Sequence, residues 1–152
     1  MFSSNMNRFS LIGVLTLALM VSCGDSHEQK AAEACARHFA YDYFNFKYVD
    51  ALKYTTADTR EVLSFLSSNM THRVIDSLHL VTDTPAITLK HVELSGDTAA
   101  TARFEVEHVI VMDTIGQYPR VADKVRSYSL ALVRKGNEGW KVRMEAPLRS
   151  EE

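Results

Sequence analysis

The chain has 152 residues, of which 46% are hydrophobic and 24% are charged, and its formal net charge at pH 7 is -2 with histidine neutral. This length suits a single domain with one buried core. The 17 Lys and Arg residues do not outnumber the 19 Asp and Glu residues, so the composition argues against a nucleic-acid-binding protein.

The first predicted element is a leader over residues 1–22. An uncharged, mostly apolar run, Leu11–Val21, follows Arg8 and ends just before Cys23. This pattern is typical of a secretory signal peptide, and the run is shorter than the roughly 18 to 20 apolar residues that a membrane-spanning helix requires. The leader is therefore a targeting segment and does not belong to the fold.

The end of the leader, Met20-Val21-Ser22-Cys23, resembles a bacterial lipobox. The resemblance implies cleavage before Cys23, attachment of lipid to its thiol, and acyl chains that hold the domain at a membrane. Met20 stands where leucine is usual, so an unmodified secreted protein is the alternative. Gly24 replaces the aspartate of an inner-membrane retention signal, which favours the outer membrane.

Residues 23–30 are polar and predict a short lipidated tether. From Ala31 to Phe46 the apolar residues recur with the period of an α-helix. Two polar residues, His38 and Asp42, lie one turn apart inside that apolar stripe. Either they lie at its margin and reach water, or they line an internal cavity.

Two further helices are predicted before the pattern changes. Tyr48 and Leu52 are the apolar positions of a short second helix, and a helical stripe from Val62 to Leu78 predicts a third. From Pro85 onward the residues alternate with a period of two, which indicates four strands: Ala86–Leu94, Thr98–Met112, Val121–Arg134 and Trp140–Pro147. The first strand drifts out of phase, and a bulge near Lys90 or His91 would restore its alternation.

Helices followed by an antiparallel meander predict an α+β fold. We expect three N-terminal helices to pack on the concave face of a curved four-stranded antiparallel sheet over residues 31–147, with residues 148–152 as a polar tail. Such a cone leaves a cavity at one end, and the side chains in that cavity decide the function.

Two segments, Phe46–Thr55 and Gly136–Val142, resemble the nuclear transport factor 2-like, or cystatin-like, superfamily. Within it the likeness is to the small bacterial lipoproteins of unknown function described as lumazine-binding-like, and it spans about residues 28–147. The resemblance implies a cone-shaped domain, frequently paired, that binds a small apolar ligand or a protein partner. Both segments are packing features, so no catalytic residue of the family is carried over.

The pattern places His38, Asp42 and His108 inward. In a pocket enzyme Asp42 would orient His38 while His108 faces them across the cavity, an arrangement suited to proton transfer. A structural role at the edge of the core and ligand binding are the alternatives. No fourth donor is in evidence, so neither a metal site nor a cofactor is predicted. Cys35, alone once Cys23 carries lipid, is interpreted as a small buried hydrophobe rather than a reactive thiol.

The outer face of the third strand is small and mildly apolar and predicts a homodimer interface. The residues of this face are Val125, Ser127, Ser129, Ala131 and Val133, with Val109 and Val111 as an extension. We therefore expect a membrane-anchored, non-enzymatic module that binds a small ligand or a protein partner. The alternatives are an isomerase or dehydratase acting through His38, Asp42 and His108, and a structural envelope component without a cavity.

Overall fold

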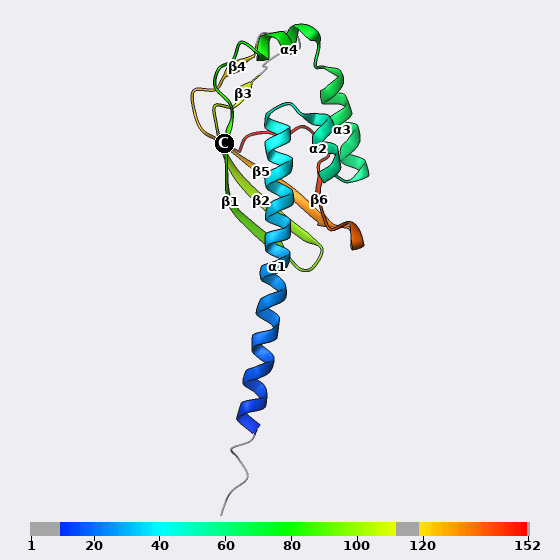
Figure 1. Ribbon diagram of the computed structural model, residues 1–152, viewed down its shortest axis with the longest axis vertical. Coiled ribbons are helices and arrows are strands. Elements are labelled where there is room, and N and C mark those ends of the chain that lie inside the picture. Colours follow the sequence, from blue (N-terminus) through cyan, green and yellow to red (C-terminus); the bar gives the residue numbers. More distant parts are fainter. Residues whose placement is uncertain (1–9, 112–118, 152) are drawn as a thin grey trace, which may run out of the picture.

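A computed structural model describes residues 10–111 and 119–151, with side chains from Ser26 onward (Figure 1). Residues 1–9 of the leader, the side chain of Cys23 and the predicted strand end at Met112 lie outside this description. The helices are α1 (Ser10–Phe44), α2 (Tyr48–Ala51), α3 (Ala57–Ser68) and α4 (His72–Leu78), with 3-10 turns η1 (Leu52–Tyr54) and η2 (Gly136–Glu138). The strands are β1 (Ala86–Ser95), β2 (Ala99–Glu107), β3 (Ile110–Val111), β4 (Arg120–Val121), β5 (Arg126–Arg134) and β6 (Trp140–Arg143).

The predicted α+β class and the four-stranded antiparallel sheet are confirmed. The strands follow the order β1-β2-β5-β6, and β3 and β4 form a separate two-stranded sheet that the sequence did not predict. The register of β1 against β2 shifts between Leu89 and His91, which confirms the predicted bulge. Beyond the bulge, Val92 is buried at 3% exposure.

Helix α1 lies across the four-stranded sheet and supplies one side of the core (Figure 1). Ala32, Ala36 and Phe39 are completely buried, and the two alanines allow a close approach of the helix to the strands. Phe104 of β2 and Leu130 of β5 are each 1% exposed and belong to the same core. Burial of each large side chain contributes about 1.5–3 kcal/mol, so this layer accounts for much of the stability of the fold.

The described residues contain four α-helices, so the predicted number of three is wrong. The expected third helix is interrupted after Ser68. The side-chain amide of Asn69 donates to the carbonyl of Phe65 at 3.0 Å, which closes α3. The hydroxyl of Thr71 accepts from the backbone N–H of Val74 at 3.4 Å and begins α4 as an N-cap. The apolar stripe continues across the break, and for this reason the periodicity alone suggested one helix.

Residues 23–30, the predicted tether, are helical and continuous with the rest of α1. Glu28 holds this segment to the sheet, because one carboxylate oxygen accepts from the Trp140 indole at 3.0 Å and the other pairs with the Arg134 guanidinium at 3.0 Å. The segment contains no proline, and a single glycine, Gly24, is tolerated within a helix. The polar composition therefore reflects a solvated helix surface with one anchoring carboxylate.

The chain end that was predicted as a polar tail packs against the domain. Strand β6 pairs with Ala131–Arg134 of β5 and leaves the first half of β5 without a neighbour on that side. Glu151 fills the vacancy by an antiparallel bridge to Ser127, whose carbonyl accepts the Glu151 N–H at 2.8 Å. Leu148 also reaches the end of α1, where its N–H donates to the hydroxyl of Tyr43 at 3.0 Å.

A candidate ligand-binding pocket at the end of the first helix

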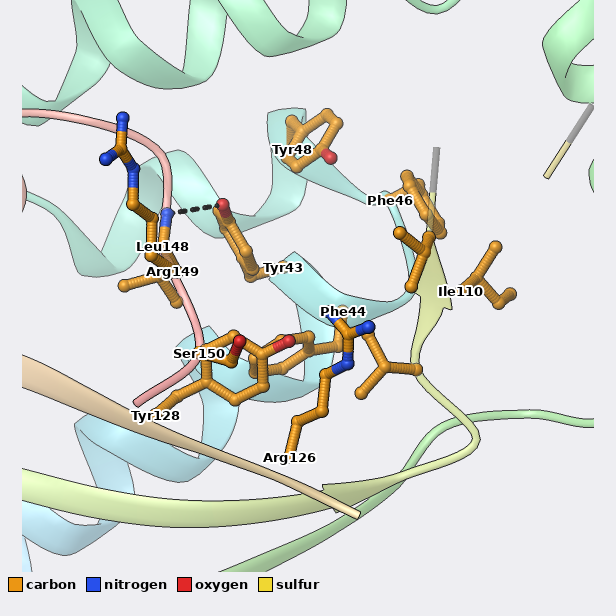
Figure 2. Close-up of a pocket in the computed structure, with 12 residues that line it drawn as sticks. Tyr43, Phe44, Phe46, Tyr48, Ile110, Arg126, Tyr128, Leu148, Arg149 and Ser150 are labelled. Carbon is orange, nitrogen blue, oxygen red and sulfur yellow. Dashed lines mark hydrogen bonds between the residues drawn. The ribbon is translucent and has the colours of Figure 1, made fainter. Parts of the chain in front are cut away.

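A pocket of about 380 Å³ lies where the last turn of α1 meets β3, the start of β5 and the C-terminal segment (Figure 2). This volume falls within the range of roughly 300–1,000 Å³ that is usual for small-molecule sites. Its lining consists of Tyr43, Phe44, Phe46, Tyr48, Val109, Ile110, Val111, Arg126, Tyr128, Leu148, Arg149 and Ser150. Side chains from both ends of the sequence thus converge on one hollow.

Aromatic rings form most of the wall. Phe44 and Tyr128 approach to 4.8 Å between centroids, and Tyr43 meets Tyr48 edge to face at 5.7 Å. Packing on α1, α2 and β5 fixes these rings before any ligand arrives, because Tyr43, Phe44, Tyr48 and Tyr128 are each less than 10% exposed. A preformed aromatic wall of this kind favours flat, apolar ligands.

Phe46 reaches the pocket because α1 ends in a Schellman motif. The N–H of Phe46 donates to the carbonyl of Tyr43 at 3.1 Å, and the N–H of Lys47 donates to the carbonyl of Asp42 at 2.8 Å. Phe46 has φ 60, a left-handed conformation that glycine usually occupies and that costs another residue about 1 kcal/mol. In this conformation its ring lies against Tyr48, with 6.0 Å between centroids.

Three tyrosine hydroxyls supply the polar part of the lining. Burial raises the pKa of Tyr43, Tyr48 and Tyr128 above the usual value of 10.0, and the Arg126 guanidinium beside Tyr128 opposes part of the increase for that residue. All three hydroxyls therefore keep their protons at neutral pH and can donate hydrogen bonds. The oxygen of Tyr43 already accepts from Leu148, which leaves its own O–H free to donate.

The charged residues in the described part of the lining are both arginines. Arg126 is half-buried, and Arg149 is exposed at the mouth. No carboxylate of the described residues forms an ion pair with either guanidinium, and the described residues of the lining include no Asp, Glu, His, Lys or Cys. The described residues of the lining therefore offer hydrogen-bond donors and positive charge, and none of them is a usual general base.

The structure does not bring the three predicted site residues into this pocket. His38 stacks on Tyr54 with 5.4 Å between centroids, and it borders a separate hollow of about 330 Å³ between α1 and β1. Asp42 is 8% exposed on α1. Within the described part of the chain no hydrogen bond or ion pair joins His38, Asp42 and His108.

His108 is exposed because the backbone reverses its alternation there. His108 follows the last residue of β2 and has φ 54, again in the left-handed region. The reversal turns Val109 inward, to 6% exposure, and brings Val111 to the pocket. These two valines therefore do not extend the outer face of β5, on which Val125 is 53% exposed and Ser129 bonds to the Glu151 carboxylate.

Sequence reasoning missed the arginine and the tyrosines of the pocket. Tyr43 and Tyr48 were assigned to helix packing, while Arg126 and Tyr128 were not considered as ligands. A signal was nevertheless present, because Arg126 and Tyr128 have the same strand parity as the buried Leu130 and lie at one end of β5. Aromatic and cationic residues on the inward parity of a strand end are candidates for a pocket rather than a core.

No protein-family model, curated protein or solved structure matches this chain. Within residues 10–111 and 119–151, no helix combines the length and apolar character needed to cross a membrane. The same residues contain no cluster of three or more His, Cys, Asp or Glu side chains arranged to hold a metal ion.

Proposed function

We propose that this protein is a lipid-anchored envelope lipoprotein whose domain binds a small ligand in the pocket at the end of α1. The observation that carries the proposal is the pocket itself: fixed aromatic walls surround tyrosine hydroxyls and Arg126, and the described residues of its lining include no general base. A concave site with mostly apolar walls and a few convergent polar groups is typical of small-molecule binding sites.

The proposed localisation rests on the leader and on Cys23. Acylation at Cys23 after removal of residues 1–22 would attach the domain to a membrane, and Gly24 favours the outer membrane. We also propose the nuclear transport factor 2-like cone as the relationship of the fold, supported by the α+β class, by a helix across the sheet and by a pocket at one end. Pairing through the exposed face of β5 remains part of the proposal.

Proton-transfer catalysis by His38, Asp42 and His108 is less well supported. His108 is exposed, the His38 ring stacks on Tyr54, and none of the three lines the pocket. Replacement of His108 by Ala should therefore leave ligand retention by the pocket unchanged, which separates the binding module from the enzyme.

Native mass spectrometry of the full chain, purified from membranes in mild detergent, tests ligand binding. The expected result is a population whose mass exceeds that of the acylated chain by one small molecule. Ser150→Trp places an indole at the pocket lining and should abolish that population, whereas Ser95→Trp at the distant end of β1 should not. Retention of the same molecule by Ser150→Trp would show that it binds elsewhere.

The anchor is tested separately. Cys23→Ser should move the protein from the membrane fraction to the soluble fraction and remove incorporation of labelled palmitate. Membrane association that survives this substitution would contradict a lipid on Cys23.

A further inference from the structure

We propose that the ligand is an aromatic carboxylate, held with its carboxylate toward Arg126 and its flat body against the aromatic wall. This inference rests on the proposed function, because it names the chemical class of molecule that the same pocket binds. It goes beyond that function in requiring a negative charge on the ligand.

The charge of the described pocket lining is opposite in sign to the net charge of the chain. The chain as a whole carries a formal net charge of -2, yet the described residues of the pocket lining include two arginines and no acidic residue. Among the described residues neither Arg126 nor Arg149 has a carboxylate partner. The half-buried Arg126 guanidinium bonds to the neutral Tyr128 hydroxyl and not to a carboxylate, so an incoming anion would supply an opposite charge that the described residues around it do not provide.

Tyrosine hydroxyls accompany Arg126 as hydrogen-bond donors in the pocket. Figure 2 shows Arg126 rising from the floor of the pocket beside Phe44, with the Tyr128 hydroxyl on the same side. A guanidinium presents a planar fork of N–H groups that matches the two oxygens of a carboxylate. Tyr128 and Tyr43 add neutral O–H donors, and because the Tyr43 oxygen is occupied by the Leu148 N–H, its proton is available to a ligand. The cationic fork of Arg126 together with the neutral O–H donors of Tyr43 and Tyr128 favours an anion over a neutral hydrogen-bonding group.

The apolar part of the pocket is compact and aromatic. Phe44, Phe46, Tyr43, Tyr48 and Tyr128 surround a space of about 380 Å³, which suits a compact ring system rather than a long chain. Aromatic pairs in offset or edge-to-face contact gain about 0.5–1.5 kcal/mol beyond burial of their area, so ring-bearing ligands are favoured over aliphatic ones of equal size.

Calorimetric titration of the full chain in detergent, with two matched probes, tests whether the ligand is an aromatic carboxylate. Naphthoate carries the carboxylate, and naphthamide is its neutral isostere of nearly the same size. Each probe is also titrated into detergent alone as a reference. We expect naphthoate to bind at least about tenfold more tightly than naphthamide, the difference that a charge-assisted hydrogen bond provides, and to weaken as salt is added.

Variants at Arg126 assign the charge preference to a residue. Arg126→Gln should weaken naphthoate binding about 10- to 100-fold and leave naphthamide nearly unchanged. Arg126→Lys, which keeps the charge but loses the fork, should give an intermediate affinity. Arg103→Gln, at an exposed position of β2, is the matched control and should alter neither probe. Thermal unfolding of each variant verifies that it is folded.

The outcomes separate this inference from the proposed function. Equal affinity for the two probes, lost in Ser150→Trp but insensitive to Arg126→Gln, would overturn the carboxylate and leave the binding pocket intact. Failure of both probes and of native mass spectrometry to show any molecule sensitive to Ser150→Trp would overturn both. Preference for naphthoate that survives Arg126→Gln would also overturn the role given to Arg126.

Discussion

The backbone N–H of Leu148 donates a hydrogen bond of 3.0 Å to the hydroxyl of Tyr43. Through this bond the C-terminal segment, 105 residues away in the sequence, is tied to the last turn of α1 and becomes a wall of the pocket. This hydrogen bond therefore both holds the C-terminal segment in place and shapes the pocket.

Tyr43→Phe removes the acceptor and leaves the partly buried Leu148 N–H without a partner. We expect a loss of about 1 kcal/mol in the free energy of unfolding, faster amide exchange at Leu148 and weaker ligand binding. Urea titration and hydrogen exchange measure the first two effects. Tyr41→Phe is the control, because Tyr41 is 55% exposed. Equal effects of the two substitutions would show that the Leu148 contact contributes nothing.

Stability should fall in alkaline solution because of Cys35. Burial is the main cause that raises the pKa of its thiol from 9.0 to about 11. Between these values the unfolded chain loses the proton while the folded chain keeps it, so stability decreases as pH rises above about 9, by up to about 1.4 kcal/mol per pH unit. The buried tyrosines act in the same direction from about pH 10.

Urea unfolding at a series of pH values tests this assignment. Cys35→Ala should be less stable at neutral pH because it leaves a small cavity, but its stability should decline less between pH 9 and 11. A parallel decline in the two proteins would assign the whole effect to tyrosine. At neutral pH the native thiol should react with a disulfide reagent far more slowly than the unfolded one.

Thr59 holds the start of α3 to the end of β6. Its hydroxyl oxygen accepts the Met144 N–H at 2.8 Å, and the side chain is completely buried. Thr59→Val has nearly the same shape but lacks the acceptor, so we expect a loss of about 1–3 kcal/mol in the free energy of unfolding. Thr59→Ser keeps the hydroxyl and should lose only about 1 kcal/mol, from the absent methyl group. If Thr59→Ser were less stable than Thr59→Val, packing of the methyl group would contribute more than the hydrogen bond.

Glu28 joins the exposed part of α1 to the sheet through Trp140 and Arg134. Glu28→Ala should destabilise the fold by about 1 kcal/mol or less, since the Glu28 and Arg134 side chains are 29% and 39% exposed and the ion pair is screened. Trp140 is the single tryptophan, so its fluorescence reports the loss of the carboxylate directly. Glu33→Ala, on the same helix, should leave the emission unchanged.

The sequence predicted those features that depend on local periodicity. The alternation in β2 identified the buried face of Ala102 and Phe104, and the phase drift in β1 located the bulge beside Leu89. The break at Asn69 was not predicted, because the apolar stripe continues through it and side-chain caps weigh little against such a pattern. His108 was placed inward because parity counting assumes extended backbone, and its positive φ reverses the count.

The pocket depends on contacts that no local pattern contains. Leu148 looked like part of a tail, and Arg126 looked like an ordinary charged strand residue. The C-terminal segment folds back over the pocket because the first half of β5 lacks a strand neighbour and the end of α1 offers a further contact. A single sequence does not reveal such contacts between segments that lie far apart in the chain.

Because α1 is continuous, it fixes the distance between Cys23 and Tyr43. Twenty residues separate Cys23 from Tyr43 within this helix, and at 1.5 Å per residue they span about 30 Å. If Cys23 is acylated and α1 stands upright on the bilayer, the opening beside Tyr43 lies about 30 Å from the membrane surface. In that orientation the pocket would take up molecules dissolved in the surrounding water and not molecules held between lipid tails.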